Sequence, residues 1–270
     1  MRIALTGLTG IVGGFLDRAI RAAGHDLNPL PGYRLGDAPD LDGHDALIHA
    51  AFAHAPGRYR GGEGDDVEGF RRLNIDGTLR LFEAAAKSGV GRIVFLSSRA
   101  VHDGHPSGTV LTDDLPAAPT NLYGAVKAEA EAALTALPLH GVSLRATGVY
   151  GPGKANKWRG RFADYLAGRP VPPRVATEVH GDDLGQAAML ALRPEAPATL
   201  NVSDLVLDHH DLLAEVARLT GCRHPLPPRA DASALHIADC SGLAALGWRP
   251  GGTDLLRATL PSLLDQRADL

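Results

Sequence analysis

The chain has 270 residues, 44% of them hydrophobic, which favours a packed globular protein over a disordered one. Its 27 basic and 31 acidic residues give a net charge of −4, which offers no electrostatic footprint for nucleic acid or an anionic membrane, so we expect a small-molecule partner. Cys222 and Cys240 form neither a disulfide framework nor a metal-ligand spacing, so we expect free thiols and no metal site. Met1 leads directly into an apolar strand, and no apolar run approaches the ~18 residues of a membrane span, so we expect a cytoplasmic protein without a signal peptide.

The N-terminal segment predicts a strand, a glycine-rich turn and a helix. Ile3 to Leu5 is a short apolar run, and residues 15–24 have the pattern of an amphipathic helix closed by glycine. Between them, Gly7, Gly10 and Gly13 are spaced three apart. Glycine at such a turn lets the backbone approach a pyrophosphate, and the helix N-terminus adds amide groups and a positive dipole end. The segment therefore predicts a dinucleotide-binding site.

Strands and helices then alternate along the chain. Further strands are expected at 25–31, 46–51, 92–98, 142–147 and 199–202. Helical patterns are expected at 70–88, 123–137, 208–220 and 254–264, with another periodic segment at 177–192. This alternation predicts an α/β fold with a Rossmann-type, doubly wound parallel sheet. The interval between the second and third strands is too short for a full crossover, so one helix should be missing there.

After Tyr150 the alternation of strand and helix patterns is interrupted by a glycine- and proline-containing, basic segment. We therefore predict a dinucleotide-binding domain made of residues 1–150 and 177–203, and a smaller, interleaved C-terminal substrate lobe made of residues 151–176 and 204–270.

The end of the second strand bears on the choice between NAD and NADP. An acidic side chain there would hold the ribose 2′-hydroxyl of NAD, whereas a basic one would accept the 2′-phosphate of NADP. The sequence from Leu30 to Arg34 has no acid, and Arg34 is either a phosphate ligand or a solvated loop residue. The pattern slightly favours NADP.

Three polar side chains form the candidate catalytic group. Tyr123 and Lys127 lie four apart on a predicted helix and share one face. A neighbouring ammonium favours the phenolate and lowers the pKa of a phenol from about 10, which would make Tyr123 an acid/base group. Ser98 ends the preceding strand, at the edge where open α/β sheets bind ligands, and either orients the reacting oxygen or caps the strand.

Together these motifs resemble an extended short-chain dehydrogenase/reductase, of the NAD-dependent epimerase/dehydratase family. The matching pieces run almost from end to end of the chain: Thr6 to Gly13, His49 to Ala51, Asn74 to Thr78, Ser97–Ser98 with Val101, Tyr123 to Lys127, Leu144–Arg145, Val149 to Gly153, Val179 to Asp183, Asn201–Val202 and Gly247–Trp248.

The resemblance implies hydride transfer to or from nicotinamide, with Tyr123 as general acid/base, Lys127 on the nicotinamide ribose and Ser98 on the substrate oxygen. Asn74 would brace the neighbouring strand–loop backbone near the cofactor. The expected cofactor-binding residues are Gly7, Thr9, Gly10, Ile11, Val12, Arg34, Ala50, Ala51, Phe52, Asn74, Leu96, Tyr123 and Lys127. The expected substrate-binding residues are Ser98, Arg99, Thr147 and Arg161. Relatives commonly dimerise through a four-helix contact, which here would include the helices of Phe70 and Tyr123.

Departures from the family pattern narrow the range of reactions that we expect. Arg99–Ala100 stand where dehydratases of the family carry Asp-Glu, so sugar 4,6-dehydration is not expected. His102 replaces an aromatic residue near the substrate and is either a second titrating group or, as we favour, a surface histidine. The glycine-rich segment 54–65 is either a lid or a loop without function.

Six basic residues after Gly153 either clamp a diphosphate or carboxylate or form a solvated face: Lys154, Lys157, Arg159, Arg161, Arg169 and Arg174.

Three functions stay open on the sequence alone. The first is an oxidoreductase acting on a sugar or sugar-like substrate, the second is a nucleotide-sugar 4-epimerase with tightly bound NAD, and the third is a non-catalytic dinucleotide sensor.

Overall fold

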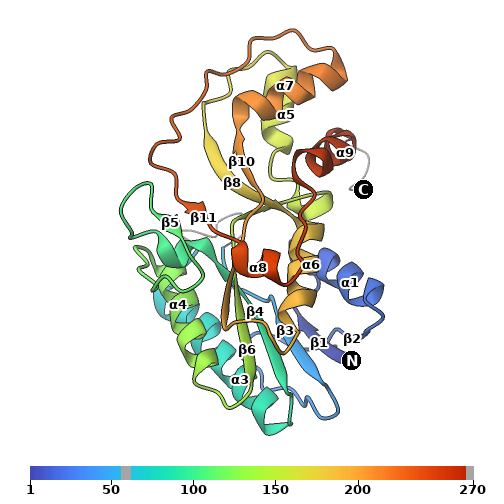
Figure 1. Ribbon diagram of the computed structural model, residues 1–270, viewed down its shortest axis with the longest axis vertical. Helices are drawn as coiled ribbons and strands as arrows, with labels where there is room; N and C mark the ends of the chain where they lie inside the picture. Colours follow the sequence, from blue (N-terminus) through green and yellow to red (C-terminus); the bar gives the residue numbers. More distant parts are fainter. Residues whose placement is uncertain (56–61, 266–270) are drawn as a thin grey trace.

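A computed structural model describes residues 1–55 and 62–265 of the chain. In Figure 1 a large sheet covered by helices occupies the lower part of the molecule, and a smaller lobe lies above it. Residues 56–61, within the glycine-rich segment 54–65 for which a lid or a loop without function was expected, lie outside the described part of the chain.

The large sheet has six strands in the order β2-β1-β3-β4-β6-β9, and every neighbouring pair is parallel. Its strands are β1 (Arg2–Thr6), β2 (Asp26–Asn28), β3 (Ala46–His49), β4 (Arg92–Ser98), β6 (His140–Ala146) and β9 (Thr199–Val202). This confirms the predicted doubly wound sheet. The strand order reverses beside β1, between β2 and β3, and such a reversal opens a ligand crevice at the carboxyl edge of the sheet.

Helices cover both faces of this sheet. On one face, α1 (Gly13–Ala22) packs against α6 (Gly181–Ala191), and their apolar side chains join those of β1 and β6 in one core. On the other face lie α3 (Gly77–Lys87) and α4 (Leu122–Thr135), over a second core that includes Leu47, Phe82 and Ile93. The short helix α2 (Val67–Arg71) runs through a π-helical turn, η1 (Arg72–Asp76), into α3. Residues 29–45 contain no helix, as the short interval predicted.

The smaller lobe is built on a three-stranded sheet. Its strands are β7 (Gly148–Tyr150), β8 (Val175–His180) and β10 (Leu205–Asp208), with β8 in the centre. The helices α5 (Arg159–Leu166), α7 (His209–Thr220) and α9 (Gly252–Leu264) surround a core that includes Trp158, Phe162 and Leu260. The periodic segment 177–192 thus divides between β8 and α6. The two-domain division at residues 150, 176 and 203 stays a prediction.

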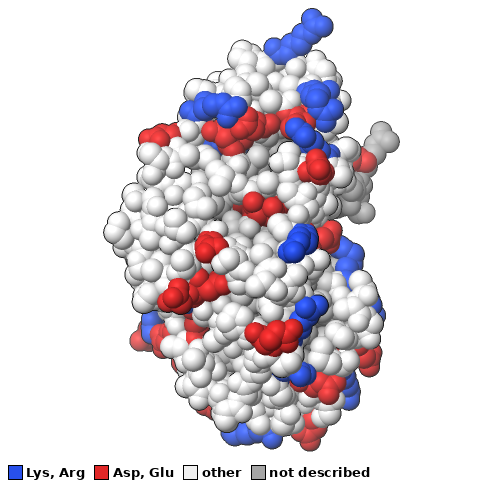
Figure 2. All heavy atoms as spheres, in the orientation of Figure 1, with Lys and Arg blue, Asp and Glu red and all other residues white. Residues whose placement is uncertain are grey.

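The remaining elements are short. Strand β5 (Val110–Leu111) pairs with β11 (Ile237–Ala238), and the remaining elements are α8 (Ser241–Ala245) and the 3-10 turns η2 (Arg99–His102) and η3 (Gly153–Ala155). In the described part of the chain, no helix combines the length and apolar character needed to cross a bilayer. On the face shown in Figure 2, acidic and basic side chains are interspersed.

Candidate active site

A cavity of about 810 Å³ lies at the carboxyl edge of the large sheet, below the smaller lobe. The glycine loop after β1 lines one part of it, the ends of β3 and β4 with α4 line another, and residues of β8 and of the segment before α5 line the third. The cavity therefore brings together segments far apart in the sequence.

The glycine loop is shaped for close approach. Gly7 has a φ of +80°, and a Cβ there would lie 2.6 Å from the backbone of Ala50 and Ala51. The Gly10 amide donates a hydrogen bond to the Gly7 carbonyl at 2.9 Å, and a Cβ on Gly13 would overlap the Leu8 carbonyl. Only glycine fits at positions 7 and 13, which allows a tight turn directly before α1. The five loop residues expected to bind cofactor all line the cavity: Gly7, Thr9, Gly10, Ile11 and Val12.

A buried histidine braces the strands beneath this loop. The Nδ1 atom of His49 is hydrogen-bonded to the Thr6 hydroxyl at 2.7 Å, and its Nε2 atom to the Thr78 hydroxyl at 3.0 Å. The Thr6 hydroxyl in turn accepts the Ala51 amide at 3.2 Å. Burial first, and then the charge of Lys127, lower the pKa of His49 to about 3, so the ring is neutral. His49 belongs to a motif that matches the family pattern, but the sequence alone indicates no role for it.

Asn74 holds the segment that follows β3. Its side chain accepts the Ala53 amide and donates to the Ala53 carbonyl, both at 2.8 Å, and it also donates to the carbonyl of Phe70. Ala50, Ala51 and Phe52, just before this brace, line the cavity, whereas the buried Asn74 does not. Its position fits the expected bracing role, and direct contact with a cofactor stays a prediction.

Ser98, Tyr123 and Lys127 all line the same cavity. Ser98 ends β4, and its hydroxyl accepts the amide of Ala100 in the next turn at 3.2 Å. Helix α4 begins beside this turn because Asn121 caps it through the amide of Gly124 at 2.9 Å, and a Cβ on Gly124 would lie 2.5 Å from the Ala100 carbonyl. Glycine at 124 therefore allows the start of α4, with Tyr123, to approach the end of β4.

The ammonium of Lys127 is buried among aromatic rings. It donates to the Leu96 carbonyl at 2.7 Å and lies 4.4 Å from the centroid of the Phe52 ring and 4.6 Å from that of Phe95. Burial lowers the pKa of Lys127 to about 7, and the carboxylate of Glu131 opposes this shift. The Phe52 ring also meets Tyr123 edge to face, with centroids 5.2 Å apart.

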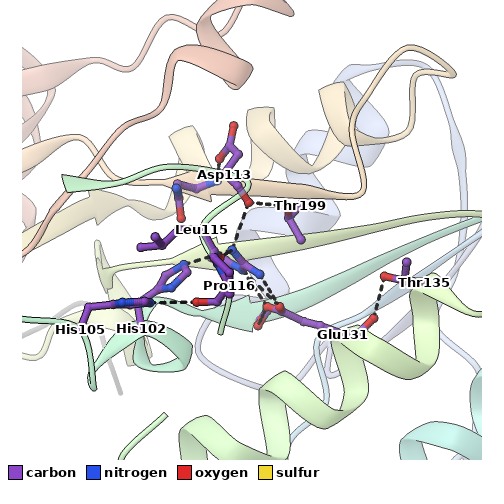
Figure 3. A network of polar contacts seen from close by, with 11 residues as sticks. His102, His105, Asp113, Leu115, Pro116, Glu131, Thr135 and Thr199 are labelled. Atoms are coloured by element: carbon purple, nitrogen blue, oxygen red, sulfur yellow. Dashed lines mark hydrogen bonds and ion pairs between the residues drawn. The ribbon is translucent and has the colours of Figure 1, made fainter. Parts of the chain in front are cut away.

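Behind this group lies a buried polar network centred on Arg145 of β6 (Figure 3). The guanidinium of Arg145 donates through Nε and Nη2 to the carboxylate of Glu131, one turn after Lys127, at 2.8 to 3.2 Å. The hydroxyl of Ser97 donates to the same carboxylate. Nη1 of Arg145 reaches the carbonyls of Asp113 and Leu115. The network ties α4 to β4, β6 and the segment that precedes α4.

The expectation of a surface histidine at 102 is wrong. His102 is completely buried, and its Nε2 atom accepts a hydrogen bond from Nη1 of Arg145 at 3.1 Å. Burial and the charge of Arg145 lower the pKa of His102 to about 4. The physical reason is packing, because the 3-10 turn after β4 directs this side chain inward against Arg145.

Other residues expected at the site fall into two groups. Leu96, Arg99 and Thr147 line the cavity, with Arg99 ion-paired to Asp103 at 3.1 Å. Arg34, in an exposed loop after β2, and Arg161, on α5, do not line it, and their binding roles stay predictions.

The far part of the cavity contains charged residues that the expected site omitted. Lys157, Arg174 and Glu178 of β8 line it there, whereas Lys154 lines the cavity beside the glycine loop. Glu178 is buried and ion-paired with Lys157, and burial raises the pKa of its carboxyl. Lysine and arginine in the segment before β8 had signalled a cationic region, whereas Glu178 gave no signal because it lies within a strand pattern.

A doubly wound sheet, a glycine loop at its first turn, and a serine, tyrosine and lysine on one cavity define a dinucleotide-dependent α/β enzyme of the oxidoreductase/epimerase type. The chain belongs to the NAD dependent epimerase/dehydratase family, whose model matches residues 3–193.

Curated relatives match most of the chain. A UDP-glucose 4-epimerase of Corynebacterium glutamicum is 27% identical, covering 94% of this chain and 92% of the relative. A 3-diazoavenalumate denitrifying reductase of Streptomyces sp is 30% identical, covering 93% of this chain and 96% of the relative. Among solved structures, the Thermus thermophilus UDP-glucose 4-epimerase in complex with NAD is 25% identical, with a TM-score of 0.77, and the match covers 98% of this chain and 100% of the other.

Proposed function

We propose that this protein is an NAD(P)-dependent oxidoreductase that transfers hydride between nicotinamide and a hydroxyl or carbonyl carbon of a sugar or sugar-like substrate. The observation that carries the proposal is that Ser98, Tyr123 and Lys127 line the same cavity as the glycine loop. The proposed acid/base group and the proposed pyrophosphate-binding loop could therefore both contact a dinucleotide and a substrate bound in this one cavity.

The residues of the cavity fit a dinucleotide. Glycine at 7 and 13 lets the loop pack closely on the backbone of Ala50, Ala51 and Leu8, and the loop so held would bring its backbone amides to the phosphates. Ala50, Ala51, Phe52 and Leu96 would line the path toward the reacting ring. When bound, the dinucleotide would supply or accept the hydride.

Side chains of the protein would carry out the proton transfer that accompanies hydride transfer. The phenol of Tyr123 would donate a proton to the substrate oxygen, or remove one from it, while the Ser98 hydroxyl holds that oxygen. The ammonium of Lys127 favours the phenolate of Tyr123 electrostatically and would donate to a ribose hydroxyl. Replacing Tyr123 with Phe keeps the ring and removes the proton, so turnover should fall by about 10²-fold or more. A variant that retained near-original turnover would refute this role.

The choice of NADP over NAD would rest on Arg34. The short β2 ends without an acidic residue, and the exposed loop after it contains Arg34. Dissociation constants of NAD and NADP should differ in favour of NADP, and Arg34→Ala should remove that difference. A clear preference for NAD in the unchanged protein would reject this role for Arg34.

A second candidate is a nucleotide-sugar 4-epimerase, which oxidises and re-reduces one carbon with tightly held NAD. Arg174 in the far part of the cavity favours it, because such a cation matches diphosphate oxygens, whereas Lys157 is already ion-paired with Glu178. The UDP-glucose 4-epimerases among the relatives also support it.

Two measurements separate the candidates. Mass spectrometry of ligands retained on the purified protein would reveal bound NAD, NADP or a nucleotide sugar. Incubation with UDP-glucose should give UDP-galactose without net NADH if the protein is an epimerase, whereas a free sugar or sugar-like substrate should give net NAD(P)H formation or consumption if it is an oxidoreductase. Dinucleotide binding without either reaction would favour the sensor.

A homodimer is a further proposal, through the face that contains α3 and α4. Exposed Val67 and Leu73 lie in the adjoining α2 and η1, and support an apolar contact between copies. Light scattering of the purified protein should give twice the chain mass of 28.3 kDa. A mass equal to one chain would contradict the dimer.

A further inference from the structure

Lys154 links the segment before α5 to the glycine loop. Its ammonium donates a hydrogen bond to the carbonyl of Thr9 at 2.6 Å, across 145 positions of sequence. Lys154 lines the same cavity as Gly7, Gly10 and Val12. A cation from the expected substrate lobe thus lies at the turn that the proposed function assigns to the pyrophosphate.

Packing fixes the backbone before Lys154 against α1. Gly151 has a φ of +155°, and a Cβ there would lie 2.5 Å from the ring of Phe15 on α1. A Cβ on Gly181 would also overlap this ring, and His180 meets it edge to face with centroids 5.8 Å apart. Because Phe15 follows the glycine loop directly, its contacts set the position of the 151–154 segment over the loop.

The charge of Lys154 is not neutralised within the described part of the chain. Its hydrogen bond to Thr9 leaves two N–H donors of the ammonium available for another acceptor. Lys157, three residues later, is instead ion-paired with the buried Glu178. Lys154 and the loop amides therefore present positive charge to the same part of the cavity.

We propose that Lys154 is a dinucleotide-binding residue, whose ammonium holds the pyrophosphate together with the loop amides. This inference rests on the proposed function, and adds to it that the expected substrate lobe contributes to the cofactor site. A pyrophosphate carries acceptor oxygens and negative charge, which a lysine matches as a point charge. Binding of the dinucleotide would thereby tie the 151–154 segment to α1.

Calorimetric titration with ADP and with adenosine tests the proposal, because the two ligands differ by the pyrophosphate. Lys154→Gln should weaken ADP binding about tenfold, the usual effect of one charge-assisted hydrogen bond, and should leave adenosine binding unchanged. It should also reduce the dependence of ADP affinity on salt concentration. Lys154→Arg, which keeps the charge, should retain most of the affinity for ADP.

Lys87→Gln is the matched control, because it removes the same charge from an exposed residue that ends α3 and does not line the cavity. It should bind ADP as the unchanged protein does. The inference fails if Lys154→Gln binds ADP with unchanged affinity, or if it loses adenosine affinity to the same extent. If the unchanged protein binds neither ADP nor any dinucleotide, the proposed function fails and the inference with it.

Discussion

The ammonium of Lys127 lies over the ring of Phe52, 4.4 Å from its centroid, and the same ring meets Tyr123 edge to face. Phe52 therefore touches both groups of the proposed acid/base pair, although it comes from the segment after β3 and they come from α4. Phe95, which lies on β4, also contacts the ammonium. The rings restrict where Lys127 can place its charge, and they exclude water from it.

We predict that Phe52→Leu lowers turnover about thirtyfold, since cation–π contacts in desolvated sites contribute roughly 2 kcal/mol. The change keeps an apolar side chain and removes the π face. Phe70→Leu is the control, because Phe70 packs edge to face on Phe52 but forms no described ring contact with Lys127. Steady-state kinetics of the two variants should differ, and equal losses would assign the effect to packing alone.

The pKa of Lys127 predicts how cofactor affinity depends on pH. Burial lowers this pKa from 10.5 to about 7, so the free protein loses the ammonium as pH rises through 7. A ligand that accepts a hydrogen bond from the ammonium then has to restore the proton, and its affinity should fall as pH rises above 7. Fluorescence titration with NAD(P)H at pH 6 and pH 8.5 measures this.

In the same titration, Lys127→Met should bind NAD(P)H weakly and with no such change between the two pH values. A pH dependence that persisted in this variant would have to come from another group.

His49 predicts a loss of stability on mild acidification. Its folded-state pKa of about 3 is below the unfolded value of 6.5, so the unfolded chain takes up the proton first as pH falls. The stability is fully present above pH 6.5 and is lost progressively toward pH 3, at ~1.4 kcal/mol per pH unit. Urea unfolding should therefore show about 2 kcal/mol less stability at pH 5 than at pH 7 from this residue.

His49→Gln should be less sensitive to pH over this range, because the amide can still bond to Thr6 and Thr78 but does not titrate. An equal loss in His49→Gln and in the unchanged protein would contradict the assignment.

The parts of the site that follow from local sequence were predictable. The spacing of Gly7, Gly10 and Gly13 and the pairing of Tyr123 with Lys127 depend on one turn or one helix, and all of these residues adjoin or line one cavity. By contrast, the burial of His102 depends on a partner 43 positions away, Arg145, and no local pattern gives that contact.

The same holds for the polar network as a whole. Glu131 lies on a helix and Arg145 on a strand, and they meet because β4 and β6 pair in register and α4 packs across them. The basic residues after Gly153 likewise take different positions that the sequence does not give: Lys154 reaches the glycine loop, whereas Arg161 lies on α5 and does not line the cavity.

We predict that the contributions of Arg145 and Glu131 to the free energy of unfolding are strongly coupled. Both side chains are about 6% exposed, so removing one leaves the other charge buried without its partner. Glu131→Leu or Arg145→Met alone should cost about 3–5 kcal/mol of unfolding free energy, whereas the double variant should cost much less than the sum. Urea denaturation of the four proteins gives the coupling energy. Additive losses would show that the ion pair does not act as a unit, and that α4 is held against β6 by its apolar contacts.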